Sequence, residues 1–263
     1  LLVDQNQNPI LSDVLFVGVS HTQSSVENNR FVMESGLEIY DLNIWERPIR
    51  LAQLPTSSPI LGVDVLGNSV YLAGGEAGIY VVDITDLRQP SIIRELSLGG
   101  DVATDLSINN DLGILAVSFL RGDSGYVQFF DLSNGHMATP IGYPIVSFDG
   151  ELQGKPYQIQ WLGNSLHVLL SKENGFKHVE ITDLGAGGVP TLLHSDVAVD
   201  NQTTSPNLSM VVFEGQLVLS IGEDYVILKK EDQTWNPVYW EQTGNSLMLN
   251  GGQVMTSNGA GFK

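Results

Sequence analysis

The chain has 263 residues, of which 12 are Lys or Arg, 30 are Asp or Glu, five are His and none is Cys. The net charge of −18 argues against binding to the phosphate backbone of a nucleic acid or to anionic lipid. The lack of Cys excludes disulfides, thiolate metal sites and a Cys nucleophile, and no apolar run reaches the roughly 18 residues of a membrane-spanning helix, so we expect no membrane insertion.

The composition favours a β-rich, turn-rich, exported protein. Charged residues make up 16% of the chain and Gly accounts for 28 residues, whereas an ordinary globular domain has about 25% charged residues. We therefore expect an extracellular or cell-surface protein of bacterial type. The chain starts at Leu1-Leu2 without a basic segment followed by an apolar one, so we expect a mature chain or a segment of a longer one.

One pattern recurs along the chain: a Gly, an alternating apolar run that ends in a polar residue, and a Pro several residues later. Four copies begin at Gly36, Gly78, Gly125 and Gly175, and a degenerate fifth copy begins at Asp224. The copies follow one another at about 42 to 49 residues, a period typical of repeat architectures. A sixth copy begins at Gly261.

The second copy shows the content of one unit. In chain order we predict strands over 60–66, 70–73, 79–84 and 92–96, separated by turns at Gly67-Asn68 and at 74–77 and by a loop over 86–90. Four short strands per unit without helical periodicity predict an all-β fold, a β-propeller of about six four-stranded antiparallel blades. The alternative is a two-sheet sandwich, which gives no reason for the Gly, the polar residue and the Pro to repeat in phase.

These boundaries predict a single propeller domain over 1–263, as part of a longer chain. The predicted blades are 1–58, 59–100, 101–154, 155–205 and 206–244, with a partial blade at 245–263. Two closures of the ring remain open. The segment 1–4 either completes the partial sixth blade as its third strand or forms the innermost strand of the first blade.

The run Gly78-Ile-Tyr-Val-Val-Asp83-Ile-Thr-Asp86-Leu-Arg-Gln-Pro90 resembles the LVIVD repeat. Leu87 stands where that repeat usually has its first Pro, and the run Phe176 to Asp183 is a looser match. The resemblance implies a surface or secreted β-propeller of bacteria or archaea, and it implies no catalytic residue.

The polar residue that ends each repeated run is interpreted as a structural anchor, because a short carboxylate at a strand end accepts N–H bonds from the following turn. These anchors are Asp41, Asp83, Asp131 and Glu180.

Polar residues on the first strand of several blades are expected to face the central channel. They are Asp64, Asp105, Gln158 and Gln160. Two carboxylates around a channel are able to perform acid–base chemistry on a glycoside, although channels are also lined by polar residues simply because water fills them.

The sequence contains no strong metal or cofactor motif. The five His are dispersed, and the chain lacks HExxH, an EF-hand loop, a phosphate-binding glycine loop and the GxSxG elbow. We predict no cofactor and no transition-metal site. Ca²⁺ remains open at two irregular acidic loops, which contain Asp196, Asp200 and Asn201, and Asn109, Asn110 and Asp111.

Two loops are unusually long, at 21–35 and at 196–206, and long loops on a rigid scaffold often carry binding residues. The candidates in them are Glu27, Asn28, Asn29, Arg30, Asp200 and Asn201. Arg121-Gly122-Asp123-Ser124 also matches an integrin-binding motif, but four residues without context do not establish such a site.

We therefore expect a non-catalytic propeller that binds a protein or a glycan, with no nucleic-acid partner. Two alternatives remain: a propeller enzyme that acts on polysaccharide through Asp64 and Asp105, and a structural spacer in a large surface protein.

Overall fold

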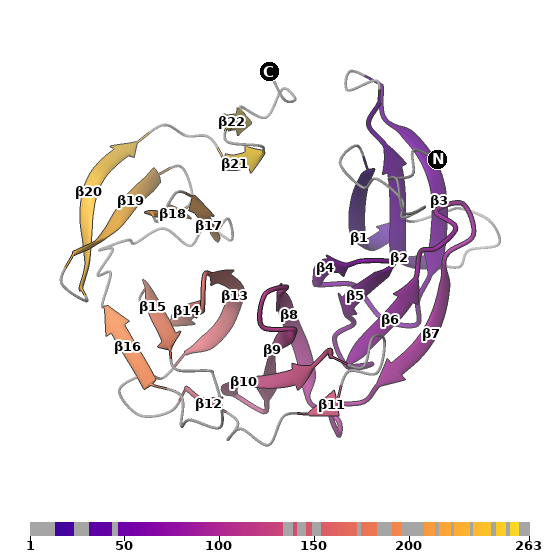
Figure 1. Cartoon of the computed structure of the whole chain (residues 1–263), viewed down its shortest axis with the longest axis horizontal. Coiled ribbons are helices and arrows are strands. Elements are labelled where there is room, and N and C mark those ends of the chain that lie inside the picture. Colours follow the sequence, from indigo (N-terminus) through magenta and orange to yellow (C-terminus); the bar gives the residue numbers. More distant parts are fainter. Residues whose placement is uncertain are drawn as a thin grey trace. The chain divides into compact units, whose positions relative to one another are not determined.

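The computed structural model describes residues 14–23, 32–43, 47–133, 139–140, 146–148, 154–172, 175–182, 191–195, 208–213, 216–221, 224–231, 234–242, 246–250 and 253–257. These residues form antiparallel β-sheets, and no helix occurs among them (Figure 1). The described part of the chain accordingly contains no helix long and apolar enough to cross a membrane. The predicted all-β propeller fold is confirmed.

The chain divides into two compact units, Leu1–Ile145 and Val146–Lys263. Unit 1 holds three sheets, in the pairing orders β1-β2-β3, β4-β5-β6-β7 and β11-β10-β9-β8, with β12 also paired to β10. Their strands are β1 Val14–Gln23, β2 Val32–Asp41, β3 Ile49–Pro55, β4 Gly62–Leu66, β5 Ser69–Ala73, β6 Ile79–Asp83, β7 Ser91–Leu96, β8 Val102–Asn109, β9 Ile114–Arg121, β10 Ser124–Asp131, β11 Thr139–Pro140 and β12 Val146–Ser147. Both residues of β12 belong to unit 2.

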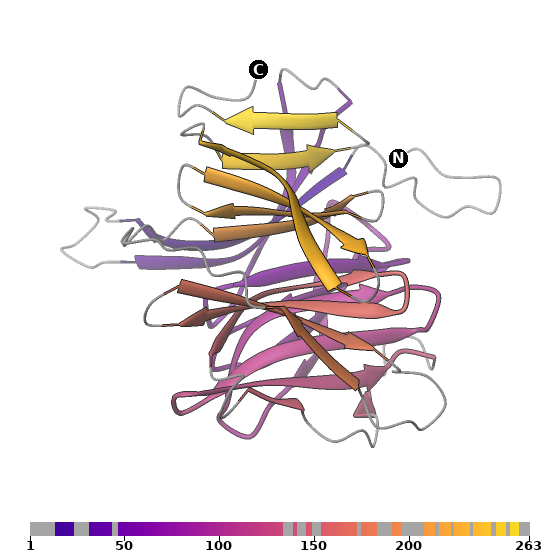
Figure 2. The same cartoon turned by 90° about the vertical axis from the view of Figure 1, so that its left-hand side faces the viewer.

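Unit 2 holds two four-stranded sheets, β13-β14-β15-β16 and β17-β18-β19-β20, and the hairpin β21-β22. Figure 2 shows them as successive sheets. Their strands are β13 Lys155–Leu162, β14 Ser165–Lys172, β15 Gly175–Thr182, β16 Thr191–Ser195, β17 Leu208–Phe213, β18 Gln216–Ile221, β19 Asp224–Glu231, β20 Thr234–Gln242, β21 Ser246–Asn250 and β22 Gln253–Ser257.

The repeated glycines lie in different sheets. Gly36 lies in β2, Gly78 precedes β6, Gly125 lies in β10 and Gly175 opens β15, and no two of these strands pair with each other. A Cβ at Gly36 would overlap the Leu54 carbonyl oxygen of the neighbouring strand. A Cβ at Gly78, where φ is +86°, would overlap the Leu96 carbonyl in the same way. The glycine is needed because the last strand of the sheet passes too close for a side chain.

Strand β5 is buried on both faces, which explains its unbroken apolar run. Alternation places Val70 and Leu72 on one face, where they pack with Leu37 and Ile39 of β2. Tyr71 lies on the other face and packs with residues of β8 and β9, including Leu106 and Val117. The sheets of unit 1 are therefore held face to face by two apolar layers.

The structure bears on the first long loop and on the segment at the start of the chain. The long loop predicted over 21–35 is shorter than expected, because β1 and β2 stay paired as far as Gln23 and Val32. Segment 1–4, on which the two ring closures depend, lies outside the described residues.

Candidate functional site

Asp64 of β4 reaches the next sheet. The first strands β4 and β8 lie in contact, and the Ile108 N–H of β8 donates a hydrogen bond of 2.7 Å to Asp64 Oδ2. The other oxygen, Oδ1, accepts the N–H of Val65 at 2.7 Å. The side chain is half-buried, so both carboxylate oxygens are bound to backbone while the group keeps some access to solvent.

Asp105 of β8 lies close to Asp64. A Cβ at Gly62 would stand 3.0 Å from the Asp105 Cα and would overlap its Oδ1, so the Asp105 carboxylate occupies the space that Gly62 leaves empty. Asp64 is two residues further along the same strand and on the same face. The two carboxylates are therefore neighbours on this face of β4.

The environments of these two carboxylates differ. Burial raises the pKa of Asp64 above the ordinary value of an aspartate, although the N–H bonds from Ile108 and Val65 act in the opposite direction. Asp105 Oδ1 accepts the N–H of Leu106 at 2.8 Å, and the side chain is half-buried. A carboxyl group whose pKa is raised by burial, beside a second carboxylate, is an arrangement that acid–base catalysis uses.

Gln158 of β13 makes a contact like that of Asp64 in unit 2. Its Oε1 accepts the N–H of Met210 at 2.5 Å, and its Nε2 donates to the Met210 carbonyl at 2.9 Å. Gln160 is half-buried and pairs in register with His167. Asp64 and Gln158 therefore connect first strands of neighbouring sheets, a role that the sequence did not suggest, while the channel position of the four residues stays a prediction.

Three of the four predicted anchors form turns of the same kind. Asp83 Oδ1 accepts the N–H of Thr85 at 2.9 Å and its hydroxyl at 2.6 Å. Asp41 binds the N–H and the side-chain amide of Asn43 at 2.8 and 2.7 Å. Asp131 binds the N–H and the hydroxyl of Ser133, and these bonds lower its pKa.

Glu180 has a partner in the next sheet. It is 1% exposed, and Lys230 Nζ, from β19 of that sheet, donates to its two oxygens at 2.7 and 2.9 Å. Its predicted role as an anchor stays a prediction, because the turn over 183–190 lies outside the described residues. Glu180 belongs to a buried polar cluster with Lys230, His167 and His178.

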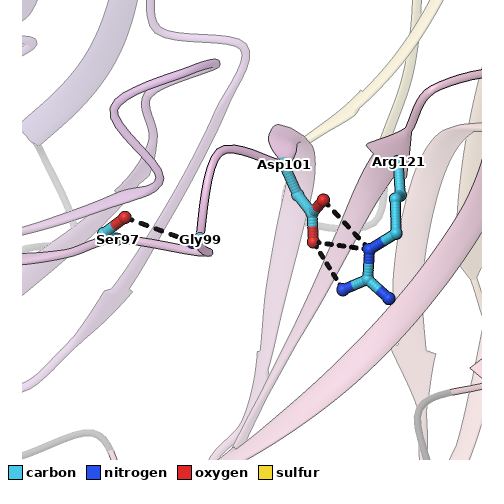
Figure 3. A network of polar contacts seen from close by, with 4 residues as sticks. All are labelled: Ser97, Gly99, Asp101 and Arg121. Atoms are coloured by element: carbon cyan, nitrogen blue, oxygen red, sulfur yellow. Dashed lines mark hydrogen bonds and ion pairs between the residues drawn. The ribbon is translucent and has the colours of Figure 1, made fainter.

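The RGDS segment occupies a tight turn. Gly122 has φ +60°, and Ser124 pairs with Arg121 across the hairpin. The Arg121 guanidinium binds both oxygens of Asp101, with a shortest distance of 2.7 Å, and lies over the stacked rings of Phe119 and Tyr126. Figure 3 shows this pair beside the turn in which the Gly99 N–H donates to Ser97 Oγ. The arginine of the motif is thus held by an internal partner.

The predicted binding residues Glu27, Asn28, Asn29, Arg30, Asp200 and Asn201 lie outside the described residues, as does Asp196. In the other acidic loop, Asn109 Oδ1 accepts the N–H of Leu112 at 3.0 Å. Among the residues that the structure describes, no group of three or more His, Cys, Asp or Glu side chains is arranged to hold a metal ion. Calcium binding stays a prediction.

Three of the solved structures with a similar fold come from bacteria and share little sequence with this chain. A periplasmic gluconolactonase from Pseudomonas aeruginosa matches with a TM-score of 0.65 and 11% identity, over 97% of this chain and 77% of that one. A putative 6-phosphogluconolactonase from Bacteroides uniformis matches with a TM-score of 0.67 and 11% identity, over 97% and 76%. A protein from Lactobacillus plantarum gives a TM-score of 0.69 and 12% identity, over 94% and 75%.

No protein-family model and no curated protein matches the chain, so the resemblance to the LVIVD repeat stays a prediction. The solved structures correct the expected function. We expected a non-catalytic propeller that binds a protein or glycan, and this expectation is contradicted by similar structures named as a gluconolactonase and as a putative 6-phosphogluconolactonase.

Proposed function

We propose that the chain is a hydrolase of sugar lactones in which Asp64 and Asp105 act as acid and base. The observation that carries the proposal is the placement of these two half-buried carboxylates on two first strands that lie in contact, with Asp105 against Gly62, two residues before Asp64, and with the pKa of Asp64 raised by burial. The names of two proteins that share the fold support the choice of substrate.

Two neighbouring carboxyl groups suit hydrolysis because one can activate a water molecule while the other protonates the leaving group, as in glycosidases that activate water. Asp105, in its ionised form, removes a proton from the water whose oxygen attacks the lactone carbonyl carbon. As the bond from that carbon to the ring oxygen breaks, neutral Asp64 gives its proton to the ring oxygen. The product is the open hydroxy acid, and proton exchange with solvent restores both side chains.

The same roles predict a pH optimum. Activity rises as Asp105 ionises and falls as Asp64 loses its proton. Because burial holds the pKa of Asp64 above its ordinary value, the falling side extends to higher pH than an exposed aspartate would allow.

We propose further that the protein works outside the cytoplasm. The name of one similar structure, a periplasmic enzyme, supports this, as does the low content of charged residues, 16%.

The direct test is proton release from glucono-lactone followed by pH-stat, with the uncatalysed rate subtracted. We expect turnover by the wild type and a fall in kcat of about 100-fold or more in Asp64→Asn and in Asp105→Asn. Asp83→Asn is the matched control: it removes a carboxylate outside the site and keeps an oxygen that binds the N–H of Thr85. No turnover above the uncatalysed rate, or full activity in both site variants with normal circular dichroism, would refute the proposal. If the protein releases reducing sugar from glycans and does not hydrolyse lactones, its substrates are glycosides and not sugar lactones.

A further inference from the structure

The interior of unit 2 contains a pair of histidines in direct contact. His167 of β14 and His178 of β15 are each 0% exposed. Their rings stack with centroids 5.1 Å apart and an angle of 16° between planes, and His167 Nδ1 lies 2.9 Å from His178 Nε2. This distance is that of a hydrogen bond in which one nitrogen donates and the other accepts.

The register explains how the pair forms. In the β14–β15 hairpin, His167 pairs with Glu180 and Leu169 pairs with His178. Residues two apart on a strand share a face, so His167, His178 and Glu180 project from one face of the sheet. The fourth member, Lys230, comes from β19 of the next sheet and binds Glu180.

The charges of this cluster balance only when both histidines are neutral. Glu180 and Lys230 carry opposite charges, and their ion pair is largely withdrawn from water, with side-chain exposures of 2% and 30%. One added proton gives the cluster a net positive charge in a buried site, which is costly. When both rings are protonated, both facing nitrogens are donors and the hydrogen bond between them is lost.

The neighbouring groups act on the pair in known directions. Burial lowers the pKa of both rings, and for His178 the charge on His167 lowers it further. Glu180 raises both pKa values and Lys230 lowers them. On the flanking strands, Gln160 of β13 pairs with His167, and Ser195 of β16 pairs with His178. Lys177 lies on the opposite face of β15 by alternation.

We propose that the histidine pair is a pH-sensitive latch that keeps the sheet β13–β16 packed against the sheet β17–β20 at neutral pH and releases it in acid. In an unfolded chain a histidine takes up a proton near pH 6.5, whereas the folded pair resists it. The contribution of the pair to stability is complete above pH 6.5 and is lost as the pH falls below that value.

The test is urea unfolding of unit 2 within the whole chain between pH 7.5 and 5.0, followed by hydrogen exchange of peptides from β14, β15 and β19. For the wild type we expect the unfolding equilibrium constant to rise by up to about 100-fold per pH unit below pH 6, tenfold for each of two protons. The double variant H167L/H178L, which replaces both hydrogen-bonding partners by apolar side chains, should lose this dependence. His194→Gln, on the neighbouring strand β16 where residue 194 pairs with Val179, is the histidine control and should keep it.

Two single variants test the mechanism without touching the rings. Glu180→Gln removes the negative charge that favours protonation of the folded rings, so the loss of stability should continue to lower pH before it levels off. Lys230→Met removes the opposing positive charge, so the loss should level off at higher pH; the wild type and both variants are followed down to pH 3 for this comparison. Shifts of the pH dependence in opposite directions in Glu180→Gln and Lys230→Met support the latch. This comparison remains decisive if the double variant H167L/H178L does not fold. An equal pH dependence in wild type and double variant, shifts of the two single variants in one direction, or loss of exchange protection outside β14, β15 and β19 before it is lost within them would overturn it.

Discussion

Replacing Asp83 by Ala removes one hydrogen-bond acceptor from the turn after β6. This acceptor serves two donors. The Thr85 N–H and the Thr85 hydroxyl bind Asp83 Oδ1 at 2.9 and 2.6 Å. A typical intramolecular hydrogen bond contributes about 0.5 to 1.5 kcal/mol, and donors near the surface regain water as a partner. We therefore expect a loss of about 1 to 2 kcal/mol in the free energy of unfolding.

Calorimetry of the variant should show a fall in melting temperature of about 2 to 8 °C, given the usual 2 to 4 °C per kcal/mol for proteins of this size. The melting temperature of Asp83→Asn should fall much less, because the amide oxygen of Asn still accepts the Thr85 N–H. An unchanged melting temperature in Asp83→Ala, or an equal loss in the Asn variant, would show that the carboxylate does not organise the turn.

Three further substitutions test other contacts. Gly78→Ala should destabilise more than Gly67→Ala in thermal unfolding, since both residues have positive φ but only the Cβ at 78 would overlap a carbonyl oxygen; equal losses would contradict this. Gln158→Leu leaves the N–H and carbonyl of Met210 without their bonds from this side chain and should cost about 1 to 3 kcal/mol in urea unfolding, a value near zero being the contrary result. Arg121→Gln should lower the melting temperature at low salt and not in 1 M salt, because ions screen an exposed pair with Asp101; a loss independent of salt would instead indicate packing on Phe119 and Tyr126.

The repeat made the fold predictable. At Gly36 and Gly78 the repeated glycine marks the strand next to the last one of the sheet, because only a residue without Cβ tolerates the carbonyl of that last strand. A steric demand of this kind at two copies of the repeat is visible in one sequence. The anchors Asp41, Asp83 and Asp131 were predictable for a similar reason, since their hydrogen-bond partners lie two residues away along the chain.

Contacts between sheets were not predictable in this way. The bond from Asp64 to Ile108 and the ion pair of Glu180 with Lys230 join residues whose separation follows no local rule. The histidine pair is intermediate. His167 and His178 looked dispersed along the sequence, yet once Lys172 pairs with Gly175 the hairpin register brings them onto one face. Pairing residues outward from the Lys172–Gly175 turn would have predicted that the two histidines lie close together on one face.

The two connections between first strands place little restriction on the sequence of the strand that they reach. Asp64 and Gln158 contact the main chain of Ile108 and Met210, and their hydrogen bonds do not involve the side chains of those residues. Every amino acid except proline supplies the same N–H, so the receiving strand can vary in sequence while the connection persists. A whole blade could therefore be exchanged for one of different sequence, provided that its first strand has a main-chain donor at this point and is not a proline there.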